Sequence, residues 1–266
     1  MDFMNSKVTR LFSIFDTTEN RDVSLKRREP ITKLLESELT KIIDIFRPDF
    51  FLEIGAFEAS FSQEMKALYP DTPVLALEAN PRVFEFFQKK VEESGVEYLN
   101  KAATSQPALV EIFIPEKIAG KDMPRIGRMG SLREVGLRDS TTTIELVEGV
   151  TIDELTEDRH FSNGCAWIDV EGVLKEVIQG GSNTLAKCNI VYTEMEISPV
   201  WNDQALAKEN IMRMHDLGFE LVARDCQKWF QFNGLFVRKN LVENDRLQER
   251  LDYFFRQAEE LFSTPE

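Results

Sequence analysis

The chain has 266 residues, of which 42% are hydrophobic, and 46 acidic against 32 basic residues give a formal net charge of −14. Such a surface repels phosphate groups, so the composition argues against binding to nucleic acid or to a membrane surface. The three cysteines are too scattered for a disulfide framework or a zinc knuckle, and the first residues lack the features of a signal peptide. We therefore expect a cytoplasmic protein.

Strands and helices are expected to alternate along most of the chain. In the first half, the expected elements are a helix at 35–46, strand 49–55, helix 61–68, strand 73–79, a helix opened by Pro81, and strands 96–103 and 110–115. In the second half, they are helix 151–158, strand 165–172, helix 174–185, strand 189–197, helix 205–217, strands 219–225 and 229–239, and helix 245–262.

This alternation predicts an α/β fold with a mostly parallel sheet covered by helices on both faces. The last two strands are separated by only a few residues, so they are expected to form an antiparallel hairpin at one end of the sheet. One main domain is expected over 49–240, with a helical extension at 1–48 and a C-terminal helix at 241–266. The segment 116–149 is expected to be an insertion that could act as a lid.

Acidic residues stand at the ends of the first two predicted strands. Gly55 allows a tight turn after Glu53, but "EIGAFEAS" lacks the further glycines of a dinucleotide-binding loop. Glu78 ends the second strand, where an acid can bind both hydroxyls of a ribose. Two acids around a glycine turn favour a nucleoside with a positive centre and no phosphate, and S-adenosylmethionine has these features.

Asp169 and Glu171 follow the buried stretch "CAWI" in "CAWIDVEG". Burying a carboxylate is costly unless it has a partner, and a sulfonium in a cleft would supply one. We expect Asp169 to be the base, or the group that orients the acceptor, with Glu171 as the second candidate. The alternative for Glu171 is that it accepts hydrogen bonds from amides of the following turn.

Other residues are candidates for binding the acceptor. Glu194 and Glu196 end the next strand and could hold acceptor hydroxyls, while Trp201 could stack on a sugar ring or pack in its loop. The segment 116–139 is the one basic region of an acidic chain. Its arginines are expected either to bind a phosphate or carboxylate of the acceptor or to lie in a solvated loop; those singled out are Arg125, Arg128 and Arg133.

From about residue 50 to 238, the chain resembles the FkbM family of S-adenosylmethionine-dependent methyltransferases. The stretches that carry the resemblance are "LEIGAFEASFS", "VLALEANPRVFEFF", "NKAATS", "VEGVTIDELTED", "WIDVEGVLKEVIQGG", "IVYTEME" and "LGFEL…FNGLFVR". The first motif of the family usually has Gly-Ala-Asn and a later glycine. Here Phe57 stands in place of the asparagine, which removes a polar contact to the ligand, and Ala59 replaces the last glycine.

The resemblance implies a seven-stranded class I (Rossmann-like) methyltransferase sheet. It also implies positions around S-adenosylmethionine: Glu53, Gly55, Ala56 and Phe57 at the methionine end, Glu78 on the ribose with Ala79 and Asn80 beside it, Lys101 and Ala102 beside the adenine, and Asp169 beside the sulfonium.

We therefore expect an O-methyltransferase that acts on a hydroxyl of a sugar, glycan or related small natural product, with S-adenosylhomocysteine as product. No metal site is recognisable, although the residues leave a carboxylate-bound divalent ion open. Two alternatives stay open, a nicotinamide-dependent oxidoreductase that uses Glu78 and a non-catalytic module that binds the cofactor or a glycan. The terminal helices could cap the sheet or pair two subunits as a homodimer.

Overall fold

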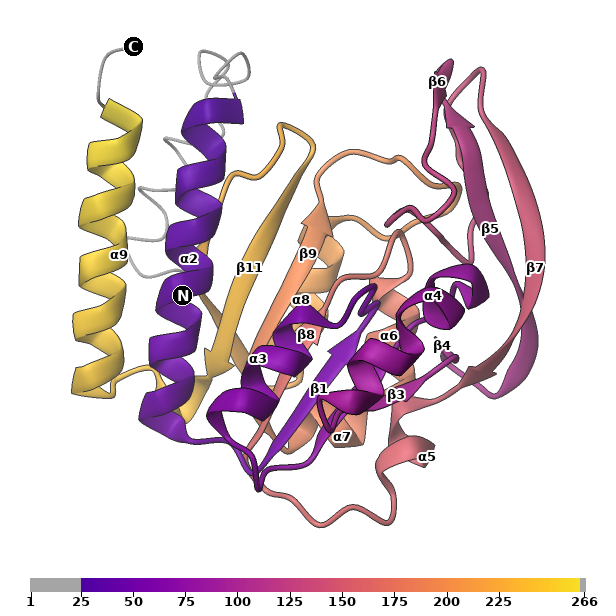
Figure 1. Cartoon of the computed structure of the whole chain (residues 1–266). Coiled ribbons are helices and arrows are strands. Elements are labelled where there is room, and N and C mark those ends of the chain that lie inside the picture. The colour runs from indigo at the N-terminus through magenta and orange to yellow at the C-terminus, as the bar shows by residue number, and fades with distance from the viewer. Residues whose placement is uncertain (1–24, 264–266) are drawn as a thin grey trace.

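The computed structural model describes residues 25–263, and its centre is a seven-stranded sheet (Figure 1). The strands, in their order across the sheet, are β10 (Phe219–Arg224), β11 (Gln231–Arg238), β9 (Cys188–Glu196), β8 (Gly164–Ile168), β1 (Phe50–Ile54), β2 (Val74–Leu77) and β3 (Glu97–Leu99). All neighbouring pairs from β9 to β3 are parallel, and β11 runs antiparallel to both β9 and β10. The predicted α/β fold and its C-terminal antiparallel hairpin are confirmed.

Helices cover both faces of this sheet, because successive strand side chains point to opposite faces. In β1, Phe51 packs into one core, whereas Phe50 and Leu52 pack into the other. The helices on the Phe51 face are α2 (Leu25–Phe46), α3 (Ser60–Leu68), α4 (Pro81–Glu93) and α9 (Asp245–Ser263). Those on the other face are α5 (Ile152–Thr156), α6 (Leu174–Gly180), α7 (Ser182–Ala186) and α8 (Ala207–Asp216).

The long helices α2 and α9 lie side by side at one edge of the molecule (Figure 1). Leu35 and Leu39 of α2 and Leu251 and Phe254 of α9 belong to the same buried core. The helix expected at 35–46 therefore begins at least ten residues earlier, and both terminal helices cap the sheet. No helix within residues 25–263 is long and apolar enough to cross a membrane.

A second sheet of four strands stands beside the main one (Figure 1). Its order is β4 (Ala102–Ala103), β7 (Thr141–Val150), β5 (Ala108–Ile118) and β6 (Lys121–Asp122). The strand expected at 96–103 is thus two strands in two sheets, and the one expected at 110–115 is longer. β7 was not expected from the sequence, and its outer face exposes Ile144 and Leu146 beside charged residues.

Two other boundaries differ from expectation. The helix expected at 174–185 breaks at Gly181, where a side-chain Cβ would lie 3.0 Å from the Val177 carbonyl oxygen. The strand expected at 165–172 ends at Ile168, so Asp169 and Glu171 lie beyond its carboxyl end and not inside it. A short 3₁₀ turn, η2 (Lys239–Leu241), connects the last strand to α9.

Candidate functional site

A cavity of about 400 Å³ lies at the carboxyl ends of β1, β2, β8 and β9. This edge of a parallel sheet is where α/β proteins bind ligands, and the volume lies within the range of small-molecule sites. Residues 127–132, from the loop between β6 and β7, contribute to its wall, as do residues from α2 and from the loop between β10 and β11. Predicted residues that line it are Glu53, Gly55, Ala56, Phe57, Glu78, Ala79, Asn80, Lys101, Ala102, Arg128, Asp169, Glu171 and Glu194.

The turn after β1 requires glycine at position 55. Gly55 has φ +78°, and its N–H and that of Ala56 both donate to the Leu77 carbonyl at 2.9 Å. A Cβ at Gly55 would lie 1.9 Å from the carbonyl oxygen of Asp169. The turn therefore brings the ends of β1, β2 and β8 into contact at the bottom of the cavity.

Glu78 is 9% exposed and is held by two backbone amides. Its carboxylate accepts from the Phe57 N–H at 2.8 Å and from the Asn80 N–H at 2.7 Å. Burial raises the pKa of Glu78 to about 7, against the two hydrogen bonds that lower it. The backbone of Phe57 therefore helps to hold Glu78, while the loss of a polar side-chain contact to the ligand at position 57 stays a prediction.

Asn80 begins α4, where its side-chain oxygen accepts from the Arg82 N–H at 3.1 Å. Its other side-chain atom, Nδ2, is buried and has no hydrogen-bond partner within the described part of the chain. A buried donor without a partner costs free energy, so this atom is ready to donate to a ligand in the cavity.

Glu53 lies on β1 and accepts from the Ser62 N–H in the first turn of α3 at 2.8 Å. Burial raises its pKa to about 7, and the charges of Asp169 and Glu78 add to the rise. One carboxylate oxygen of Glu53 therefore fixes the start of α3, while the residue also contributes to the cavity wall.

Asp169 follows β8, and its N–H donates to the Ile54 carbonyl at 2.9 Å. Its side chain is open to the cavity, yet the surrounding protein raises its pKa against the opposing charges of Lys228 and Arg128. Glu171 is only half-buried, but burial also raises its pKa, to about 8, with the charges of Asp169 and Glu196 adding to the rise.

Glu171 is oriented by Trp201, whose Nε1 donates to Glu171 Oε2 at 3.0 Å. Trp201 is 1% exposed and packs against Gly172, so the prediction that it stacks on a sugar ring is wrong. Its ring has no open face. The backbone carbonyl of Glu171 accepts from Ser131 Oγ at 2.6 Å, which joins the 127–132 wall to the end of β8.

Three other predicted acceptor residues lie outside the cavity lining. Glu196 accepts from the Gly172 N–H at 3.1 Å. It is therefore Glu196 whose side chain accepts from an amide of the turn after β8, a role that was considered for Glu171. Arg133 pairs with Glu176 at 2.6 Å and so attaches its loop to α6. Arg125 is exposed and does not line the cavity.

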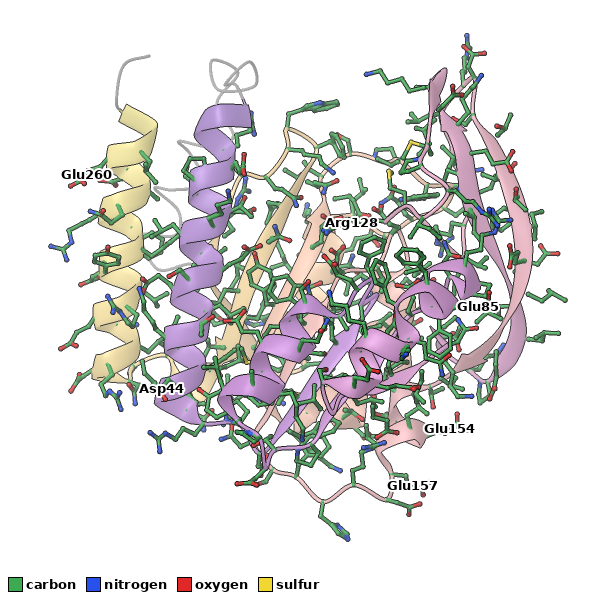
Figure 2. The ribbon with its side chains drawn as sticks, viewed as in Figure 1. Asp44, Glu85, Arg128, Glu154, Glu157 and Glu260 are labelled. Atoms are coloured by element: carbon green, nitrogen blue, oxygen red, sulfur yellow. The ribbon has the colours of Figure 1, made fainter. Side chains whose placement is uncertain are left out.

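Arg128 does line the cavity, near the carboxyl end of β1 (Figure 2). Its guanidinium lies 4.8 Å from the centre of the Phe57 ring and pairs with Glu58 at 3.5 Å. The aromatic ring at position 57 therefore supports a cation at the cavity, an effect that the sequence comparison with the family motif did not predict.

Lys228 is the main residue of the cavity that the sequence reasoning missed. It is exposed in the loop between β10 and β11, and it lowers the pKa of Asp169 and of Glu171 through its charge. The signal in the sequence is the stretch "CQKWF" in the hairpin turn, where a lysine stands beside two aromatic residues. Trp229, its neighbour, is 59% exposed.

Comparison with known families decides the class of the protein. A family model described as the methyltransferase FkbM domain matches residues 44–221. The chain belongs to the FkbM methyltransferase family. It is therefore an S-adenosylmethionine-dependent methyltransferase, and the oxidoreductase and non-catalytic alternatives are set aside.

No curated protein matches this FkbM-family chain at a significant level. Among solved structures, it is similar to a precorrin-6y C5,15-methyltransferase from Geobacter metallireducens, with 14% identity over 71% of this chain and 78% of that one and a TM-score of 0.40. The magnesium protoporphyrin IX methyltransferase of Synechocystis has 8% identity over 90% and 100% of the two chains and a TM-score of 0.41. Similarities this low say nothing about the acceptor.

Proposed function

We propose that this FkbM-family enzyme transfers the methyl group to a hydroxyl oxygen of a sugar, glycan or related small natural product. The observation that carries the proposal is the acidic floor of the cavity, where Asp169, Glu171 and Glu194 lie beside the half that contains Glu78. Carboxylates are acceptor-only groups when ionised, so they suit a ligand that presents several hydroxyl donors.

The cofactor would bind in the half of the cavity between β1 and β2. Glu78 would accept from the ribose hydroxyls while it keeps its two backbone donors, and the free Nδ2 of Asn80 would donate to the same nucleoside. Lys101 and Ala102 would flank the adenine, with Ala79 beside the ribose. Glu53, Gly55, Ala56 and Phe57 would surround the methionine end.

S-adenosylmethionine supplies a methyl group on a positively charged sulfur, and in the transfer the carbon–sulfur bond breaks, its electron pair stays on sulfur, and a carbon–oxygen bond forms. The hydroxyl proton must leave the acceptor oxygen. Asp169 is our first candidate to accept it or to orient the hydroxyl, because its side chain is open to the cavity beside the cofactor half. Glu171, held by Trp201, is the second. Positioning would supply most of the rate, and a base would add roughly 10²–10⁴-fold.

The acceptor would lie between Glu194 and two of the cations that line the cavity, Arg128 and Lys228. These cations come from two different loops, and both act on Asp169 through their charge. A phosphate or carboxylate on the acceptor would find them at the cavity, while its hydroxyls face the acidic floor. An acidic glycan or a nucleotide sugar has both kinds of group.

The test is transfer from S-adenosylmethionine with an isotopically labelled methyl group to a panel of sugars, acidic glycans and nucleotide sugars, with product analysis by NMR. We expect a methyl ether on a hydroxyl, and a fall in kcat of roughly 10²–10⁴-fold in Asp169→Asn with KM little changed. A methylated nitrogen or carbon in place of an oxygen would contradict the proposal.

A further inference from the structure

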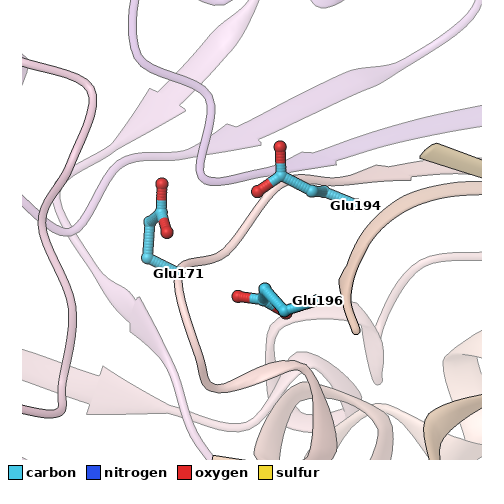
Figure 3. A group of neighbouring side chains, drawn as sticks. All are labelled: Glu171, Glu194 and Glu196. Atoms are coloured by element: carbon cyan, nitrogen blue, oxygen red, sulfur yellow. The ribbon is translucent and has the colours of Figure 1, made fainter. Parts of the chain in front are cut away.

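Three carboxylates gather behind the acceptor half of the cavity. Glu194 and Glu196 are two residues apart on β9 and so share a face, and Glu171 reaches the same place from the end of the neighbouring β8. One oxygen of each lies within 4.8 Å of one oxygen of each of the others. Figure 3 shows the three side chains gathered around one small space.

Each of these carboxylates is held by a separate donor. Trp201 Nε1 donates to Glu171, the Gly172 N–H donates to Glu196, and the side-chain amide of Gln231 donates to Glu194 Oε2. Donors of this kind orient the ligands of metal sites in proteins, because a carboxylate that binds a cation through one oxygen can accept a hydrogen bond at the other.

Glu194 shows that the cluster lacks a partner. Its side chain is 6% exposed, and Oε1 is buried with no hydrogen-bond donor in the described residues. No lysine or arginine between residues 25 and 263 forms an ion pair with Glu171, Glu194 or Glu196. Three neighbouring carboxylates repel one another, the exposed Lys228 acts on Glu171 and Glu194 only through its charge, and a buried oxygen without a donor adds a further cost.

We propose that Glu171, Glu194 and Glu196 bind one divalent cation that prefers oxygen ligands. Calcium–oxygen distances of about 2.3–2.6 Å place two opposite ligand oxygens up to roughly 5 Å apart, whereas magnesium at about 2.1 Å allows roughly 4 Å. The three oxygens lie within 4.8 Å of one another, a limit inside the span of a calcium ion, and a smaller ion would draw the side chains closer together.

The role of the ion rests on the proposed function. Glu171 and Glu194 line the cavity, so the open positions of the cation face the space where the acceptor would lie. A divalent cation lowers the pKa of an oxygen that it binds and orients it. An acceptor hydroxyl bound there would lose its proton more readily to Asp169, and Glu171 would be a ligand of the ion.

The test uses the full chain after treatment with a chelator, without cofactor or acceptor. Manganese(II) is titrated, and the loss of the free-ion EPR signal is measured for the wild type, Glu194→Gln and Glu85→Gln. Glu85, exposed on α4 away from the cluster (Figure 2), provides the same change of charge as a control. We expect one ion per chain in the wild type and in Glu85→Gln, and at least tenfold weaker binding in Glu194→Gln.

Calcium and magnesium then compete for the bound manganese, with calcium expected to compete better. Glu196→Gln is the second variant, and thermal unfolding shows whether each variant is folded. The site would be overturned if the wild type binds no manganese. It would also be overturned if folded Glu194→Gln and Glu196→Gln bind manganese as tightly as the wild type does.

The same preparations separate the site from the proposed function. Manganese binding without methyl transfer to any hydroxyl acceptor would count against the function and leave the site. Transfer that is unchanged by chelation, together with no manganese binding, would overturn the site and leave the function.

Discussion

We expect the protonation of Glu78 to couple the stability of the fold to binding of the cofactor. Its pKa is about 7 in the folded chain, against 4.5 for an ordinary glutamate side chain. The folded state therefore binds the proton more tightly, and the stability that this proton contributes is lost as the pH rises through about 7. Between about pH 5.5 and about pH 8, the loss is ~2 kcal/mol of unfolding free energy for this one group.

Glu78→Gln should remove this contribution, because glutamine does not titrate. Its amide cannot accept from both Phe57 and Asn80, but that cost is the same at every pH and leaves the slope unaffected. Urea unfolding of the wild type and of Glu78→Gln at both pH values measures the difference. If the two proteins lose the same free energy between these pH values, Glu78 is not the group that titrates.

The same carboxyl should make the affinity for S-adenosylhomocysteine depend on pH. We expect ribose hydroxyls to donate to the ionised form, which is ~10% of the molecules near pH 6 and ~90% near pH 8 for a pKa of about 7. Calorimetric titration should therefore give a Kd about tenfold larger at the lower pH. In Glu78→Gln, binding of S-adenosylhomocysteine should be weak at both pH values. A wild-type Kd that does not change with pH would refute this reasoning.

Two further predictions concern the backbone turn and the cations. Gly55→Ala should cost several kcal/mol more than Gly120→Ala in thermal unfolding, because both glycines have φ near +80°, but only a Cβ at Gly55 meets another atom, 1.9 Å away. Equal costs would show that the contact with the Asp169 carbonyl is relieved by a small shift. Arg128→Gln and Lys228→Gln should each raise the KM for an anionic acceptor severalfold, while Arg125→Gln leaves it unchanged. Equal effects at all three positions would indicate a general charge effect and no specific contact.

The sequence predicted the parts of the fold that depend on local pattern. The run "FFLEI" and the run "VLAL" are buried on both faces, which is why their positions as central parallel strands could be read directly. β7 was missed because Glu145 and Glu148 interrupt the hydrophobic residues of "TTTIELVEGV" on both faces, so the stretch resembles a polar segment. The close packing of α6 against the chain after β4 is a tertiary contact that the local pattern does not show, since a Cβ at Gly180 would lie 2.0 Å from the Thr104 carbonyl oxygen.

In the candidate site, too, the residues placed by local pattern could be predicted, and those placed by tertiary packing could not. Gly55, Glu78 and Asp169 stand at strand ends, and the rule that parallel strands end at one edge brings them together. Lys228 could not be found in this way, because its place depends on β11 pairing beside β9 and returning the hairpin loop to that edge. The sequence could not decide between the two roles considered for Trp201, because burial of a loop aromatic depends on its packing in three dimensions.

A crystal structure of the chain with S-adenosylhomocysteine tests the central claim most directly. The account predicts the ligand in the cavity at the ends of β1 and β2, with its ribose hydroxyls on Glu78, Asn80 Nδ2 within hydrogen-bond distance of the nucleoside, and the sulfur beside Asp169. A ligand bound elsewhere, or one in this cavity whose ribose does not contact Glu78, would contradict it.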